Sequence, residues 1–99
     1  MSVTIEKDAQ NWTTIHVMGR FDYESHGSFR EAYADGASCA GVIVDLSGAN
    51  YIDSAALGML LILREHVGND TQRAIIRAAR GQPLEVLSIA HFQRLFAFR

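Results

Sequence analysis

The stretch that decides the fold is Val42-Ile43-Val44-Asp45-Leu46-Ser47-Gly48-Ala49-Asn50-Tyr51-Ile52-Asp53-Ser54-Ala55-Ala56-Leu57-Gly58. Residues 42–46 are apolar except for Asp45, which is typical of a central β-strand covered on at least one face. We expect a short loop after this strand, ending at Asp53-Ser54, and a helix from there on. The nine residues after Ser54 are all apolar or glycine. This stretch therefore sets a hydroxyl and a carboxylate at the start of an unusually apolar helix.

The residues that follow complete a strand–helix–strand unit. The helix should run to about Val67, with Gly68-Asn69 as its C-terminal stop. Residues 73–77 then have the composition of another strand. Two strands joined by a helix at this spacing run parallel, with a right-handed crossover.

Two strands and a helix are predicted before this unit. Val3, Ile5 and Lys7 alternate with polar residues, and residues 13–18 alternate in the same way after a turn at Asn11-Trp12. Strands this close in sequence pair most simply as a hairpin. The segment 19–22, Gly-Arg-Phe-Asp, breaks the alternation. A helix from about Glu24 to Asp35 is expected next, stopped by Gly36.

The C-terminal part adds one more helix. Gly81-Gln82-Pro83 should start it, and it should continue from Leu84 to about Ala90. The tail, residues 95–98, is either a last edge strand or a packed extension. The predicted fold class is therefore α/β, with a mixed sheet of four to five strands and helices packed mainly on one face.

Composition limits the class of protein further. Ninety-nine residues form one domain, residues 1–99, large enough to fold alone. The net charge of −2 gives no strong field for nucleic acid or anionic lipid. We expect the single Cys39 to be a small buried apolar residue, and its lack of a disulfide partner fits the reducing cytosol. The longest apolar run is too short to cross a bilayer, and the N-terminus lacks a signal-peptide layout, so we expect a cytoplasmic protein without membrane insertion.

The motifs of common enzyme classes are missing. The sequence contains neither a phosphate-binding loop of the G-x-x-x-x-G-K type nor a dinucleotide G-x-G-x-x-G. Ser54 follows Asp53, but no nearby histidine completes a hydrolase triad. The histidines lack metal-ligand spacing and have no cysteine pair beside them: His16, His26, His66 and His91. We therefore expect no catalytic residue, no metal and no cofactor, and a binding module rather than an enzyme.

Ser54 has a structural and a functional interpretation. Either Asp53 or Ser54 could cap the helix, and we expect the cap loss in Ser54→Ala to cost about 1 kcal/mol. Alternatively, Ser54 accepts a phosphoryl group. Such a group would meet free amides and the positive end of the helix dipole, so the domain would stay folded. Its charge of about −1.5 to −2 would repel a partner docked on the neighbouring apolar residues.

The helix after Ser54 has two apolar sides. One side should lie on the sheet, with Ala56, Met59, Leu60, Leu63 and Val67. Leu57, Gly58, Leu61 and Ile62 lie on the other side, where a surface helix is normally polar. Either another segment of the chain covers this side, or it forms a contact patch for another protein. The arginines 73, 77 and 80 suggest an anion site or, more simply, solvated charges beside an apolar strand.

The stretch from Val44 to Gly58 closely resembles the signature of STAS domains, in particular of bacterial anti-sigma-factor antagonists. Gly19-Arg20-Phe21-Asp22 is similar to that family's glycine-x-x-aspartate element. The resemblance implies that Ser54 is phosphorylated by a partner that is both anti-sigma factor and serine kinase, and that a PP2C-type phosphatase reverses the modification. It implies that the unmodified protein binds the anti-sigma factor and frees the sigma factor, with Asp53 and Asp22 on the partner-binding surface.

Three hypotheses follow from these observations. The first is a phosphorylation-switched regulator of an anti-sigma factor, with Asp22, Asp53, Leu57, Gly58 and Leu61 at the interface. The second is a non-switched STAS structural subunit of a transport or signalling complex, in which Ser54 is only a cap. The third is a small enzyme that binds or hydrolyses nucleotides.

Overall fold

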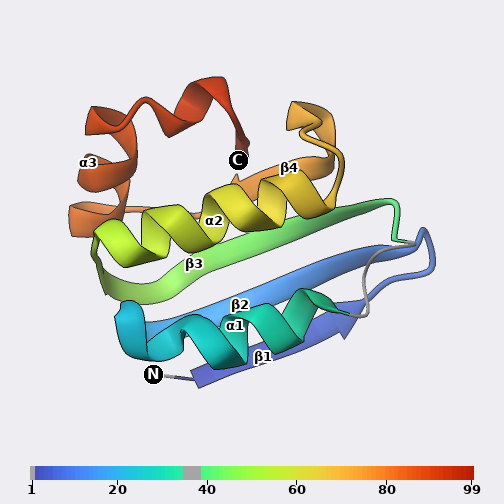
Figure 1. Ribbon diagram of the computed structural model, residues 1–99, viewed down its shortest axis with the longest axis horizontal. Coiled ribbons are helices and arrows are strands. Elements are labelled where there is room, and N and C mark those ends of the chain that lie inside the picture. The colour runs from blue at the N-terminus through green and yellow to red at the C-terminus, as the bar shows by residue number, and fades with distance from the viewer. Residues whose placement is uncertain (1, 35–38) are drawn as a thin grey trace.

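The computed structural model describes residues 2–34 and 39–99, and their strands form one five-stranded sheet in the order β1-β2-β3-β4-β5. Strand β1 runs antiparallel to β2, and every other neighbouring pair is parallel (Figure 1). The strands are β1 (Ser2–Lys7), β2 (Trp12–Phe21), β3 (Gly41–Ile52), β4 (Ala74–Arg77) and β5 (Ala97–Phe98). The prediction of a mixed sheet in an α/β domain is confirmed, as are the N-terminal hairpin and the parallel β3–β4 pair.

The helices gather on one face of this sheet. Helices α1 (His26–Ala34) and α2 (Ser54–His66) lie side by side in front of the strands, and α3 (Gly81–Ile89) lies beyond α2 on the β4 side (Figure 1). Short 3-10 turns precede α1, β4 and β5 at Tyr23–Ser25, Thr71–Arg73 and Phe92–Arg94. This arrangement confirms the prediction that helices pack mainly on one face.

The core lies between the helices and this face. Alternate residues of β2 and β3, such as Ile15, Val17 and Val44, are fully buried there. The sheet-facing set predicted for α2 is buried as a whole: Ala56, Met59, Leu60, Leu63 and Val67. The helical period thus correctly identified which side of α2 rests on the sheet.

The loop expected between the central strand and Asp53 does not exist. Strand β3 continues to Ile52 because its second half pairs with the end of β2, where Gly48 lies opposite Met18 and Ile52 opposite Phe21. Strand β2 likewise continues past the expected end at Met18 and stops at Phe21, inside the segment that breaks the alternation. One register shift between the two strands lies at Gly19/Arg20, where Gly19 has a positive φ of 85°.

The remaining boundaries differ from prediction by small amounts. A 3-10 turn at Tyr23–Ser25 replaces the expected first turn of α1, and the predicted end at Asp35 with its stop at Gly36 lies outside the described residues. Helix α2 ends as predicted, with Gly68 in the left-handed region at φ 83°. Helix α3 begins at Gly81 as predicted and ends at Ile89, and the tail forms the short strand β5.

Candidate functional site

At the start of α2, Asp53 and Ser54 occupy different positions, and only one of them caps the helix. Asp53 is the N-cap: its backbone is extended, and its carboxylate accepts a hydrogen bond of 2.9 Å from the Ala56 amide. Ser54 is the first residue inside the helix, and its side chain is exposed. Among the described residues none forms a hydrogen bond with the Ser54 hydroxyl. The cap is therefore the aspartate, and the serine hydroxyl has no structural task.

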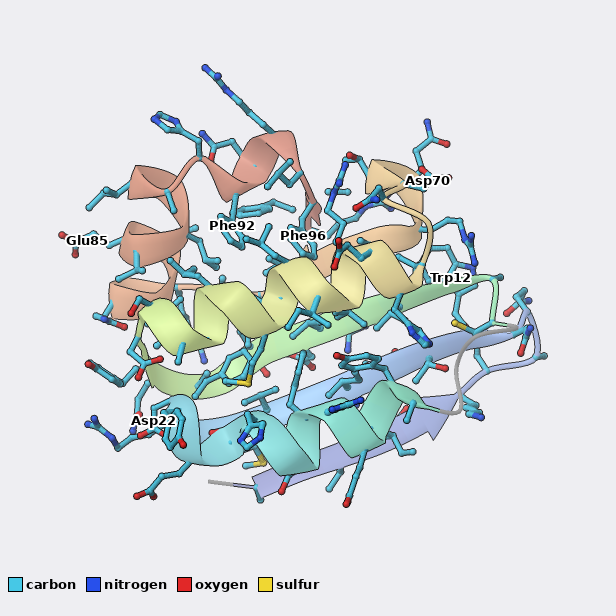
Figure 2. The ribbon with its side chains drawn as sticks, in the orientation of Figure 1. Trp12, Asp22, Asp70, Glu85, Phe92 and Phe96 are labelled. Carbon is cyan, nitrogen blue, oxygen red and sulfur yellow. The ribbon has the colours of Figure 1, made fainter. Side chains whose placement is uncertain are left out.

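A polar hollow of about 700 Å³ opens beside this helix start. Asp22 enters it from the end of β2 and Asp53 from the start of α2; the other lining residues are Arg20, Tyr23, Glu24, Ser25 and Ser28. Figure 2 shows Asp22 at the end of the molecule where α2 begins. The two aspartates singled out from the sequence thus line the same hollow, although 31 positions separate them in the chain.

Local hydrogen bonds fix the position of Asp22. Its carboxylate accepts from the Glu24 amide at 3.1 Å, and its own amide donates to the Ser25 hydroxyl at 3.1 Å. This reciprocal arrangement caps the 3-10 turn that leads into α1. Asp22 is therefore held in one orientation at the rim of the hollow.

Arg20 brings a cation to the hollow, and the sequence reading did not single it out. Its Nε lies 3.4 Å from a carboxylate oxygen of Asp22, and its guanidinium stacks over the Tyr51 ring at 4.0 Å from the centroid. The stacked contact joins the end of β2 to the end of β3. The sequence offered one signal for this contact: Arg20 comes two residues before Asp22, a spacing that places two side chains on the same side of an extended chain.

The outer surface of α2 is apolar beyond Ser54. Leu57 and Gly58 are half-buried, while Leu61 and Ile62 expose 41% and 56% of their surface. A Cβ added at Gly58 would meet nothing within 4 Å, so the surface is open above it. Spacings of four and seven residues place Ser54, Gly58 and Leu61 along one line of the helix. No described segment of the chain fills the space above Gly58, and Leu61 is exposed beside it.

Ile62 also belongs to a groove between the two front helices. The groove measures about 540 Å³ and is lined by His26, Phe29, Arg30, Tyr33, Ala34, Met59, Ile62 and His66. The edge of the Tyr33 ring meets the His66 ring at 5.2 Å between centroids. The apolar surface of α2 thus continues sideways toward α1.

The three arginines are exposed or partly exposed beside an apolar strand, as expected of solvated charges, but they also hydrogen-bond to the protein. Arg73 donates to the carbonyl oxygens of Cys39 and Ala40, both at 2.8 Å, and so fixes the chain before β3. Arg77 forms an ion pair of 3.0 Å with Asp45. Arg80 donates to the Ser47 carbonyl at 3.3 Å. Each guanidinium has a protein acceptor, and the three point to different parts of the structure rather than to one anion site.

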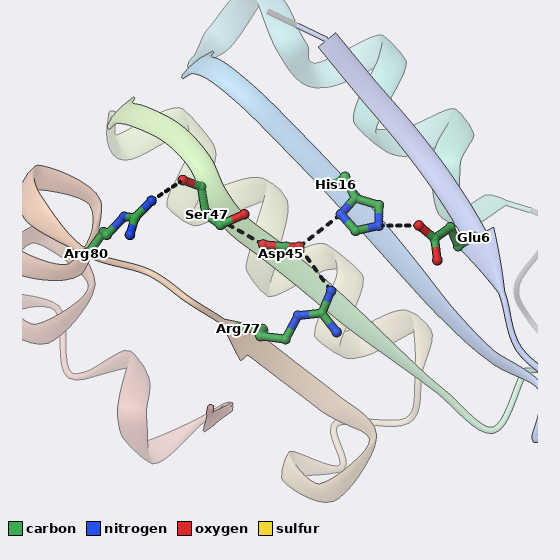
Figure 3. A network of polar contacts seen from close by, with 6 residues as sticks. All are labelled: Glu6, His16, Asp45, Ser47, Arg77 and Arg80. Carbon is green, nitrogen blue, oxygen red and sulfur yellow. Dashed lines mark hydrogen bonds and ion pairs between the residues drawn. The ribbon is translucent and has the colours of Figure 1, made fainter.

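Asp45 is a buried carboxylate that the sequence reading passed over. Partial burial raises the pKa of Asp45, but hydrogen bonds from Ser47 and Arg77 together outweigh it and hold this pKa at about 2. The carboxylate accepts from the Ser47 amide at 2.9 Å and contacts the His16 ring at 2.9 Å (Figure 3). Asp45 thus joins β2, β3 and β4 on the face of the sheet opposite the helices.

Within residues 2–34 and 39–99, no group of three or more His, Cys, Asp or Glu side chains is arranged to hold a metal ion. No helix in these ranges is long and apolar enough to cross a membrane.

Comparison with known proteins shows the family of this chain. The family model described as Mlab, STAS domain matches residues 6–97. A STAS-domain-containing protein of Pseudomonas aeruginosa is 40% identical over 84 residues, covering 84% of this chain and 83% of that protein.

Solved structures show the same fold at low identity. An anti-sigma factor antagonist from Mycobacterium paratuberculosis is 19% identical, with a TM-score of 0.81 over 98% of this chain and 83% of that one. Unphosphorylated SpoIIAA, an anti-sigma factor antagonist, is 13% identical, with a TM-score of 0.76 over 99% of this chain and 87% of that one. SpoIIAA of Bacillus has also been solved in its phosphorylated form, which matches with the same TM-score.

Proposed function

The chain belongs to the STAS domain family, and we propose that it is an anti-sigma-factor antagonist switched by phosphorylation of Ser54. In this proposal the unphosphorylated form binds an anti-sigma factor and thereby releases a sigma factor. The structural neighbours are anti-sigma factor antagonists, and they supply the class of function. The geometry at the start of α2 supports the proposed switch.

The observation that carries the proposal is that Asp53, and not Ser54, caps α2. Since Asp53 caps α2, the exposed Ser54 hydroxyl is free to be modified without loss of a structural hydrogen bond. A phosphoryl group at the first position of the helix would face free amides and the positive end of the dipole. Folding would therefore tolerate the modification.

A phosphoryl group on Ser54 would, however, prevent a partner from binding. The phosphoryl group would stand at the head of the line that continues through Gly58 and Leu61, next to the carboxylates of Asp53 and Asp22. A partner packed on this surface would bury an additional charge of about −1.5 to −2 beside existing negative charges. Because burial of an unpaired charge is very costly, the complex would dissociate.

The proposal assigns a place to each predicted interface residue. Leu57 and Leu61 form the apolar centre, and Gly58 allows close approach of a partner backbone, since the space above it is open. Asp22 and Asp53 form the polar rim across the hollow. The catalytic base and the nucleotide would belong to the partner, a serine kinase that is also the anti-sigma factor. A PP2C-type phosphatase would restore the active form, and the whole cycle would take place in the cytoplasm.

The experiment requires the chain, its candidate anti-sigma factor kinase and ATP. We expect intact mass to rise by one phosphoryl group in the native chain and to stay unchanged in Ser54→Ala, while Ser28→Ala serves as the control and is still labelled. Titration calorimetry should show that Ser54→Ala binds like the native chain. Ser54→Glu should bind at least about tenfold more weakly, with an unchanged melting temperature.

Two results would contradict the proposal. Label that persists in Ser54→Ala would place the phosphosite elsewhere. Equal affinity of Ser54→Glu and the native chain would show that Ser54 does not control binding, and would leave the non-switched STAS subunit as the function.

A further inference from the structure

The face of the sheet opposite the helices carries a row of ionisable side chains that runs across four strands. Glu6 on β1 contacts the His16 Nε2 at 3.0 Å, and the His16 Nδ1 contacts Asp45 at 2.9 Å. Asp45 then pairs with Arg77 on β4 at 3.0 Å. Figure 3 shows this row from its own side, with the helices behind the strands. The order across the sheet is carboxylate, imidazole, carboxylate, guanidinium.

Apolar side chains lie next to the row toward the start of the parallel strands. Trp12, Ile43 and Ile75 contribute to a hollow of about 370 Å³ on the same face, with Asp8, Gln10, Gln72 and Arg99 at its edges. The Trp12 ring lies over Gly41, where a Cβ would come within 2.6 Å of the ring. Toward the other end of the strands, Met18 exposes 53% of its surface. In the described residues no helix covers either group.

We propose that this face binds a second copy of the chain, with the two sheets packed face to face about a twofold axis parallel to the strands. Such an axis reverses the order of the row in the second copy. Glu6 then comes nearest to Arg77 of the second copy, and Asp45 faces the imidazole of His16. An axis along the row would instead set Glu6 against Glu6 and Arg77 against Arg77, which like-charge repulsion disfavours.

The same axis also matches the apolar groups. A rotation about an axis parallel to the strands keeps each position along the strand direction. The hollow with Trp12, Ile43 and Ile75 therefore meets its own copy, and the Met18 end meets its own copy. Apolar surface thus faces apolar surface while unlike charges face each other, so one symmetry operation satisfies both.

The outline of the molecule is comparable in size with a standard dimer interface. The molecule extends over 31 × 26 Å perpendicular to its shortest axis, a rectangle of about 800 Å² that bounds this face. A standard interface buries about 800 Å² per partner, and stacked sheets pack about 10 Å apart. The net charge of −2 opposes association only weakly. The dimer would leave the start of α2 free, because that helix lies on the other face of the sheet.

The test is sedimentation equilibrium from micromolar to millimolar concentration, with native chain and charge-reversed variants. We expect a monomer–dimer equilibrium that weakens as salt rises from 0.1 M to 1 M, where the Debye length falls from about 10 Å to about 3 Å. Glu6→Arg and Arg77→Glu should each weaken self-association at least about tenfold, because each sets like charges opposite each other at both contacts. Glu85→Arg on the exposed surface of α3 is the matched control and should leave the dimer unchanged.

An equal mixture of Glu6→Arg and Arg77→Glu gives the sharpest result. In the mixed dimer unlike charges meet at both contacts, so the mixture should associate more tightly than either variant alone. Circular dichroism and melting temperature check the fold of Arg77→Glu, and if it fails to fold, Arg77→Gln takes its place, with an expected weakening smaller than that of Glu6→Arg. A chain that stays monomeric throughout, or a dimer that Glu6→Arg does not weaken, would overturn the proposal.

Discussion

Replacement of Asp53 by alanine tests most directly whether Asp53, rather than Ser54, caps α2. Asp53 supplies the capping bond of 2.9 Å to the Ala56 amide, and its negative charge faces the positive end of the α2 dipole. Loss of an N-cap costs about 1 kcal/mol, and loss of a favourable dipole contact costs about 0.3–1 kcal/mol. Asp53→Ala should therefore destabilise the domain by about 1–2 kcal/mol.

Ser54→Ala should behave differently, because the serine hydroxyl caps nothing. Its free energy of unfolding should stay within about 0.5 kcal/mol of the native value, since surface substitutions usually fall in this range. In a domain of 99 residues each kcal/mol corresponds to about 4–8 °C in melting temperature. Thermal unfolding followed by circular dichroism resolves such a difference.

Asp53→Asn separates the two contributions. Asparagine caps as well as aspartate but has no charge, so this variant should lose only the dipole contribution. The ranking expected is native and Ser54→Ala together, then Asp53→Asn, then Asp53→Ala. If Ser54→Ala loses as much stability as Asp53→Ala, the serine shares the cap and the argument that its hydroxyl is free for modification is refuted.

Three further predictions use neighbouring positions. Gly58→Ala should raise stability by about 0.5–1 kcal/mol, because its Cβ points into open space, yet weaken anti-sigma factor binding; unchanged affinity in calorimetry would remove Gly58 from the interface. Leu61→Asp should keep the melting temperature within a few degrees while affinity falls, whereas Leu60→Asp, at a fully buried position, should not fold; collapse of both would mean that Leu61 belongs to the core. Asp45 has its pKa lowered from an ordinary value near 3.8 to about 2, so it stabilises the fold above pH 4, and this contribution is lost as pH falls through 2. Urea titrations of Asp45→Asn should show less dependence of stability on pH between about 4 and 2, and the same slope as the native chain would contradict the lowered pKa of Asp45.

Much of the fold followed from local periodicity. The apolar run at Val42–Val44, the helical spacing from Ala56 to Val67 and the Gly68 stop each carry a signal that depends only on near neighbours in the chain. These elements formed where the pattern indicated. The residues expected at the helix start, Asp53 and Ser54, were correctly placed for the same reason.

Prediction failed where the structure depends on pairing between distant segments. Residues 47–52 contain Ser47, Gly48 and Asn50, which favour a turn when judged alone. They form a strand because β2 offers backbone partners up to Phe21, and two register shifts accommodate the interruption. The local turn signal was real, but hydrogen bonding along the neighbouring strand outweighs it.

The charged row on the open face of the sheet could not be predicted for the same reason, because it depends on how distant segments pair. Glu6, His16, Asp45 and Arg77 come from four strands, and nothing in the spacing of these residues along the chain connects them. The strand order and the register bring them together, with His16 opposite Asp45 and Asp45 opposite Arg77. Asp45 interrupts an apolar strand, and such an interruption requires a partner because an unpaired buried carboxylate is costly. The interruption is visible in the sequence, but only the register identifies the partners of Asp45 as a histidine on one side and an arginine on the other.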